Sequence, residues 1–177
     1  NFDDPVPRAT LKVVGASPGL SRARSDARRY PAIDPLDSWS RYAGVVPAPR
    51  VEKLRRMLRR GNEVAQMMKV VGEEGTAMAD FIVYLKAELV DAVYLQQNAF
   101  DEHDAATPPA RQLAIFGVLE SVVGAEFAMD DKDAARRYFL NLTQAFKDWH
   151  QTAWDSEPFQ AGQAKVAALL AEAAPHA

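Results

Sequence analysis

The residues best suited to bind a ligand lie in one loop near the start of the chain. Residues 28–42 read RRYPAIDPLDSWSRY, with Tyr30 directly before Pro31. Proline disfavours helical geometry in the preceding residue, so the backbone at Tyr30 is expected to be extended and its ring to point in a fixed direction. A ring held in this way loses little entropy on binding and suits a flat ligand. The alternative is a stiff connector with Tyr30 packed in a core.

A second group of candidate residues is basic and lies on one predicted helix. A helix face of this kind can bind an anionic partner or can simply be solvated, and the spacing leaves both interpretations open. No aromatic residues alternate with these charges, which disfavours single-stranded nucleic acid as the partner. The basic residues, opposed by Glu52, are Lys53, Arg55, Arg56, Arg59 and Arg60.

The remaining clusters do not predict catalysis. DEHD at 101–104 groups three carboxylates with His103, but no other histidine shares its context, so a polar loop is favoured over a metal site. The chain has no cysteine and no Gly-Lys-Ser or Gly-Lys-Thr loop for phosphate. From the residues alone, we therefore predict neither a catalytic residue nor a metal site.

Length and composition predict an ordinary globular protein with a substantial core. The chain has 177 residues, of which 48% are hydrophobic and 25% charged, and its net charge is −3. That charge argues weakly against general nucleic-acid binding. No apolar run is long enough to span a membrane. The first residues, NFDDPVPRATLKVV, have neither an initiator Met nor a signal core, so we expect a piece of a longer protein.

The sequence changes near Arg50 from a proline-rich segment to segments with helical periodicity. Most of the prolines lie before it, together with one plausible strand at 9–14. After it, apolar residues recur at helical spacing. The predicted fold is mainly α, a helical bundle preceded by a short strand and a proline-rich loop. The predicted helices are about 50–71 (interrupted by Gly61), 76–97, 107–129, one opening at Asp130 or Asp131, and 160–173.

Apolar stripes predict which side chains form the core of the bundle. Such stripes mark the buried face of an amphipathic helix. On the second helix the stripe is Met78, Phe81, Ile82, Leu85, Leu89, Val93 and Leu95. On the third it is Leu113, Phe116, Leu119 and Val123, and on the fourth Ala135, Phe139, Leu142, Phe146 and Trp149.

The segment VVGEEGTAMAD, residues 70–80, joins the first two predicted helices. Two glycines bracket Glu73 and Glu74, which predicts an exposed acidic tip. Either the segment is a plain helix-helix turn or its carboxylates push on a partner, and the turn alone is the simpler interpretation.

Three motifs in order resemble one family. YPAIDPLDSWSRY (30–42) resembles the loop that closes the nucleotide-binding domain in catalytic subunits of rotary ATP synthases. YLQQNAFDEHD (94–104) is similar to the Leu-Gln-Gln-Asn-Ala-Phe-Asp stretch of the A subunit of V-type and archaeal-type ATPases, and DPVPRATLKVV (4–14) to its lead-in. The likeness covers almost the whole chain. It departs from the family at 15–20, where Ser17-Pro18 replaces a bulky aromatic.

The resemblance implies an adenine pocket. The family aromatic before Pro-Ala-Ile corresponds to Tyr30, with Pro31 beside it, and the Phe of Gln-Gln-Asn-Ala-Phe to Phe100, with Ala99 and Gln97 nearby. Two rings would then clamp the base, since stacking is the natural contact for an uncharged purine face and contributes about 1–3 kcal/mol per base.

The resemblance also implies partners and a place in a larger machine. The turn before the Gln-rich stretch bears on the rotor shaft in relatives, which makes Glu73, Glu74 and Asp80 candidate rotor-facing residues. The complete subunit is expected to alternate with B subunits in a hexameric ring and to bind ATP or ADP with Mg²⁺. Rotation would be coupled to proton or sodium transport, on the cytoplasmic face of the cell membrane and peripheral to it.

On this reading the chain divides into two parts. Residues 1–48 would be the tail of the nucleotide-binding domain and 49–177 the C-terminal helical bundle. The resemblance implies that the phosphate-binding loop belongs to upstream sequence, so the chain alone is expected to be inactive and to bind no nucleotide tightly. Two alternatives remain, the β subunit of the mitochondrial and bacterial type and a non-enzymatic helical interaction module.

Overall fold

The computed structural model describes residues 46–103 and 109–174, with the side chains of 94–103 left undescribed. Within those ranges the chain forms five α-helices, as the mainly α prediction requires. The predicted strand at 9–14 and the loop at 28–42 lie outside the described residues. The helices are α3 (Ala48–Val71), α4 (Met78–His103), α5 (Pro109–Gly124), α6 (Lys132–His150) and α7 (Glu157–Ala173).

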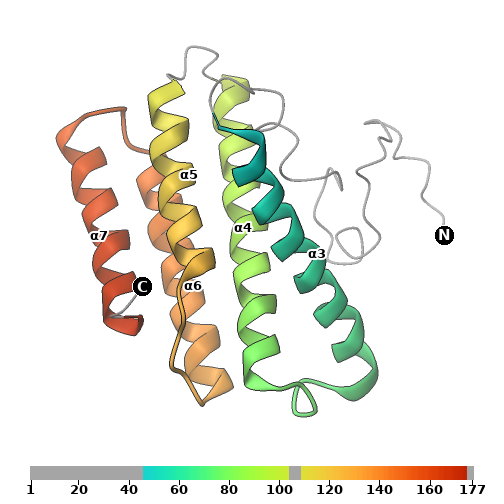
Figure 1. Cartoon of the computed structure of the whole chain (residues 1–177). Coiled ribbons are helices and arrows are strands. Elements are labelled where there is room, and N and C mark those ends of the chain that lie inside the picture. Colours follow the sequence, from blue (N-terminus) through green and yellow to red (C-terminus); the bar gives the residue numbers. More distant parts are fainter. Residues whose placement is uncertain (1–45, 104–108, 175–177) are drawn as a thin grey trace.

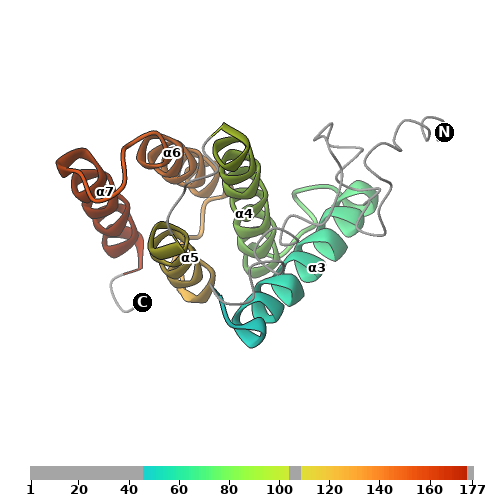
Figure 2. The ribbon, with the colours of Figure 1, turned by 90° about the horizontal axis from the view of Figure 1, so that it is seen from above.

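The helices run alternately down and up in an antiparallel array (Figure 1). α3 packs along α4, α4 along α6, and α6 along α7. α5 lies against this row, in contact with α3 and α4, as the view from above shows (Figure 2). The arrangement leaves the turn between α3 and α4 at one end of the molecule, away from α7.

α3 is continuous through Gly61, so the predicted interruption there is wrong. A Cβ built at Gly61 would lie 2.4 Å from the Cβ of Ala87 on α4. Glycine costs a helix interior about 1 kcal/mol relative to alanine. Here the missing side chain lets α3 and α4 approach closely, and their packing outweighs that local cost.

Most of the predicted core is confirmed. Phe81, Leu89 and Val93 on α4 are at most 1% exposed, and every predicted stripe residue of α6 is buried. Met78 and Val123 are partly buried against this core, and the side chain of Leu95 lies outside the part of the chain described in atomic detail. The prediction for Leu113 is wrong, because 37% of it is exposed. α5 begins by burying Arg111 and Gln112 and continues through Ile115, Phe116, Leu119 and Val122. The buried face is therefore rotated away from Leu113.

Helix boundaries follow their capping residues. α6 begins after Asp131, whose side chain accepts a hydrogen bond from the Asp133 amide at 3.1 Å, as predicted for this acidic start. α5 ends at Gly124 rather than near Met129, and Lys86 of α4 donates to the Val123 carbonyl at that end. α7 starts earlier than predicted, at Glu157, because Ser156 accepts a hydrogen bond from the Phe159 amide.

α4 extends to His103, beyond the predicted end at 97. Its last turn takes in residues 101–103, so the prediction that DEHD is a polar loop is wrong for those three positions. No glycine or proline stands between Met78 and His103, so the chain offers no strong stop signal before that point.

The end of α6 is bound by a buried cation from α5. The last carbonyls of a helix have no partner within the helix and favour positive charge. Arg111, 1% exposed, donates hydrogen bonds to the carbonyls of His150 at 2.6 Å and Thr152 at 2.8 Å. Its guanidinium also lies 5.4 Å from the ring centre of Phe159 on α7. One side chain thus fastens α5, α6 and α7 together.

The end of α5 is bound in the same manner by a cation from α4. Lys86 donates to the carbonyls of Val123 at 2.8 Å and Ala125 at 2.7 Å. Its ammonium lies 5.4 Å from the ring centre of Phe127. Burial lowers the pKa of Lys86 from its ordinary value, with the nearby carboxylate of Glu126 acting in the opposite direction.

His150 is buried beside Arg111 and is held in its neutral form. Its side chain is 1% exposed, and neither ring nitrogen has a hydrogen-bond partner in the described part of the chain. Burial, together with the charge of Arg111, lowers the pKa of His150 to about 3. Protonation in the folded state is therefore unfavourable at every pH where the protein is expected to work.

The contact at Gly61 predicts a destabilising substitution. Gly61→Ala should lower the free energy of unfolding by about 1–3 kcal/mol, because the new methyl group overlaps Ala87. Gly117→Ala is the matched control, since a Cβ there meets nothing within 4 Å and should stabilise α5 by up to about 1 kcal/mol. Chemical denaturation measures both. If Gly61→Ala were as stable as the wild type or more stable, the close contact between α3 and α4 at this position would not contribute to the free energy of unfolding.

The burial of His150 predicts a loss of stability in acid. Its folded pKa, about 3, lies below the ordinary value of 6.5, so the unfolded chain binds the proton more tightly. The stabilisation is complete above about pH 6.5 and is lost as the pH falls towards 3. Between about pH 8 and pH 5, the wild type should lose about 2 kcal/mol more than His150→Asn. Parallel pH profiles of unfolding free energy in the two proteins would contradict this.

Candidate functional site: the turn between α3 and α4

The turn at residues 72–77 is shaped by one glycine and one threonine. Gly72 has φ +82°, a left-handed conformation that favours glycine, and its amide donates to the Met68 carbonyl at 2.9 Å. Thr76, 2% exposed, donates from its hydroxyl to the Gly72 carbonyl at 2.9 Å. Its amide donates to the carbonyl of Glu73 at 3.1 Å. These bonds close the turn on itself, as the Gly-Glu-Glu-Gly pattern predicted.

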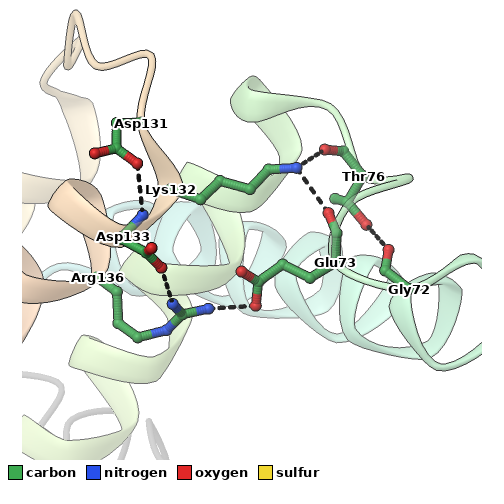
Figure 3. A network of polar contacts seen from close by, with 7 residues as sticks. All are labelled: Gly72, Glu73, Thr76, Asp131, Lys132, Asp133 and Arg136. Carbon is green, nitrogen blue, oxygen red and sulfur yellow. Dashed lines mark hydrogen bonds and ion pairs between the residues drawn. The ribbon is translucent and has the colours of Figure 1, made fainter.

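Two cations from the first turns of α6 reach across to this turn (Figure 3). Lys132 donates to the carbonyls of Glu73 at 2.7 Å and Thr76 at 2.5 Å. Arg136 forms an ion pair with the carboxylate of Glu73 and donates to Asp133 at 3.1 Å. The ion pair with Glu73 raises the pKa of the Arg136 guanidinium. Sequence reasoning missed both cations, because each lies more than fifty residues from its partner.

The three candidate rotor-facing carboxylates have different surroundings. Glu73 is partly covered by its ion pair with Arg136. Asp80 accepts a hydrogen bond from Arg60 of α3 at 2.8 Å. Glu74 is exposed, and no interaction of its side chain is found in the described part of the chain. In the described part of the chain, Glu73 and Asp80 therefore each have a cation partner, and Glu74 has none.

The end of α3 beside the turn exposes several apolar side chains together with Lys69. Val70 is 84% exposed, Val71 50% and Met67 37%. Of the described large hydrophobic side chains, Val70 is the most exposed. The sequence held a signal for this surface, because Val70 and Val71 stand directly before Gly72 and outside the buried positions of α3. An apolar surface with Glu74 at its rim can bind another protein.

The predicted adenine pocket lies outside the part of the protein that is described in atomic detail. Tyr30 and Pro31 fall outside the described residues. Gln97, Ala99 and Phe100 belong to the final turns of α4, where the backbone alone is described. Their assignment to a nucleotide site stays a prediction.

The basic face of α3 is partly neutralised. Arg59 pairs with Glu52 at 3.0 Å, and Arg55 lies 3.9 Å from the same carboxylate. Arg60 pairs with Glu63 at 3.4 Å as well as with Asp80. The remaining two basic residues, Lys53 and Arg56, are exposed. This face therefore has less free positive charge than the sequence predicts.

The chemistry available at the turn is binding and positioning. Over residues 46–93 and 109–174, no three His, Cys, Asp or Glu side chains come together as a metal site requires. No helix in the described ranges is long and apolar enough to cross a membrane. The turn offers a fixed backbone, one free carboxylate and an apolar edge.

Comparison with known proteins gives consistent matches. The family model for the C-terminal domain of V and A type ATP synthase matches residues 48–139, which begin with α3 and extend into α6. No solved structure matches the chain.

Curated relatives match nearly the whole chain. The V-type ATP synthase alpha chain of Treponema denticola is 53% identical over 174 residues, 98% of this chain. The V-type ATP synthase alpha chain 1 of Treponema pallidum is 55% identical over 170 residues, 96% of this chain. That of Borrelia hermsii is 52% identical over 159 residues, 90% of this chain. The chain spans about 30% of the length of each of these relatives.

Proposed function

The chain belongs to the family of C-terminal domains of V and A type ATP synthases, and we propose that it forms the C-terminal part of a catalytic A subunit. The observation that carries the proposal is the family match over residues 48–139, which begins with α3 and extends into α6. Identities of 52–55% to V-type ATP synthase alpha chains support it.

In the complete subunit, we propose that ATP with Mg²⁺ is hydrolysed or synthesised and that this reaction is coupled to rotation and to proton or sodium transport. The subunit would alternate with B subunits in a hexameric ring around a central rotor shaft, at the cytoplasmic face of the membrane. Residues 1–48 would end the nucleotide-binding domain, and 49–177 would form the helical bundle. The start of α3 at Ala48 supports this proposed boundary.

We further propose that this chain supplies the adenine side of the nucleotide site. Tyr30, preceding Pro31, would stack on one face of the base and Phe100 on the other, with Gln97 and Ala99 beside them. The physical support is the extended geometry that Pro31 favours at Tyr30 and the lack of charge on a purine face. The phosphates would be held by residues from outside this sequence.

The turn between α3 and α4 is the proposed contact with the rotor shaft. Glu74 is the free carboxylate of the three candidates, and the exposed Val70 and Val71 add apolar area beside it. Glu73 and Asp80 would act mainly by fixing the turn, since both are paired within the protein. A rotating partner would meet an edge that carries both apolar and charged side chains, since Lys69 and Glu74 are exposed beside the two valines.

The adenine clamp predicts a loss of nucleotide affinity. In the full-length subunit assembled with its B subunit, Tyr30→Ala or Phe100→Ala should each raise the Kd for ATP by about tenfold to a hundredfold. Tyr30→Phe is the control, because it keeps the ring and should bind normally. Titration with a fluorescent ATP analogue measures the affinity. If both alanine variants bind as tightly as the wild type, no such clamp exists.

The rotor contact predicts a defect that leaves nucleotide binding intact. Val70→Asp places a charge on the most exposed apolar side chain at the turn and should weaken binding of the rotor shaft by about tenfold. Leu140→Asp is the matched control, since Leu140 is 64% exposed on α6, outside the turn. Pull-down of the shaft by the assembled ring measures the effect. Equal shaft binding in the two variants would refute the contact.

A further inference from the structure

We infer that Lys132 and Arg136 are positioning residues that hold the α3–α4 turn at a fixed place on α6, so that the turn and α6 move as one body. The inference rests on the proposed contact between this turn and the rotor shaft. It gives Lys132 and Arg136 a part in coupling ATP hydrolysis to ion transport, which an ordinary surface cation would not have.

Lys132 fixes the backbone of the turn. Its ammonium donates to the carbonyl groups of Glu73 and Thr76, at 2.7 and 2.5 Å. These carbonyls stand at the two sides of the exposed Glu74 and Gly75. The side chain is half-buried, so water competes less for these hydrogen bonds than on an open surface. The two ends of the tip are thus tied to one atom of α6.

Arg136 fixes a side chain of the same turn. It stands one helical turn beyond Lys132, and residues four apart share a helix face. Its guanidinium pairs with the Glu73 carboxylate and with Asp133 of its own helix. Glu73 is therefore bound twice by α6, through its carbonyl group and through its carboxylate (Figure 3).

Phe81 extends the same contact to the start of α4. Its ring is fully buried and lies 5.8 Å from the Lys132 ammonium and 5.3 Å from the Arg136 guanidinium. Both distances allow cation–π attraction. The two cations thus contact the turn and the helix that follows it.

The hydrogen bonds inside the turn cannot replace this arrangement. Those of Gly72 and Thr76 join residues at most four apart, so they set the shape of the turn. They do not set where the turn lies relative to α6. In the described part of the chain, the hydrogen bonds and the ion pair that do so come from Lys132 and Arg136. They join residues 56 to 63 apart and add to the packing of α4 along α6. A displacement of the tip therefore has to move α6 or break these contacts.

The test uses the full-length subunit with Lys132→Met/Arg136→Met, in which the apolar parts of both side chains are kept. Amide exchange of Thr76, whose amide is bonded within the turn, should become about tenfold faster, while exchange in α7 stays unchanged. In the assembled complex, ions transported per ATP hydrolysed should fall to about half or less, with the KM for ATP unchanged. Arg137→Met/Lys165→Met removes the same charge from exposed positions and should change neither readout.

Two further variants separate positioning from folding. Arg136→Lys keeps a cation and should retain most of the coupling, whereas Glu73→Gln, a mild change, should shift exchange and coupling in the direction of the double variant. Unchanged exchange at Thr76 in the double variant overturns the inference, and so does faster exchange with normal coupling. The exchange measurement needs no rotor. If Val70→Asp leaves shaft binding intact, the proposed contact fails, while exchange still decides whether α6 holds the turn.

Discussion

Carbonyl groups left unpaired where helices end are the constraint on which this fold depends. A bundle with short connections buries several such groups, and each must find a donor. Here the donors are cations from other helices, Lys86 at the end of α5, Arg111 at the end of α6 and Lys132 at the α3–α4 turn. Each also lies near an aromatic ring, which compensates for part of its desolvation. The same contacts that satisfy the backbone therefore fix the order in which the helices pack.

Much of this architecture could be predicted from the sequence, because local patterns determine it. The apolar stripe of α6 and its cap at Asp131 need only neighbouring residues to be recognised. The errors arise where a distant residue decides. Gly61 predicts a break until Ala87 is known to lie against it, and Leu113 belongs to the core stripe until Arg111 is known to be buried. Long-range contacts override local preference in both cases.

The candidate site shows the same division. Two glycines around two glutamates were enough to place the turn, whereas the exposure of Val70 and Val71 before it was not predicted. The sequence could not show that Glu73 would be paired, because Arg136 is 63 residues away and any of several cations could have reached it. For Tyr30 and Phe100 the assignment still rests on motif likeness and on the physics of stacking.

The close approach at Gly61 and Ala87 has a mechanical consequence. It locks α3 to α4 well above their connecting turn, while α6 secures the turn itself. Two helices held together at separate points along their length bend less easily than either helix would alone. A close-packed interior has low compressibility and therefore transmits mechanical strain from one end of a helix pair to the other. Under the contact proposed with the rotor shaft, a force applied at the turn would reach the far end of the α3–α4 hairpin with little elastic energy stored on the way.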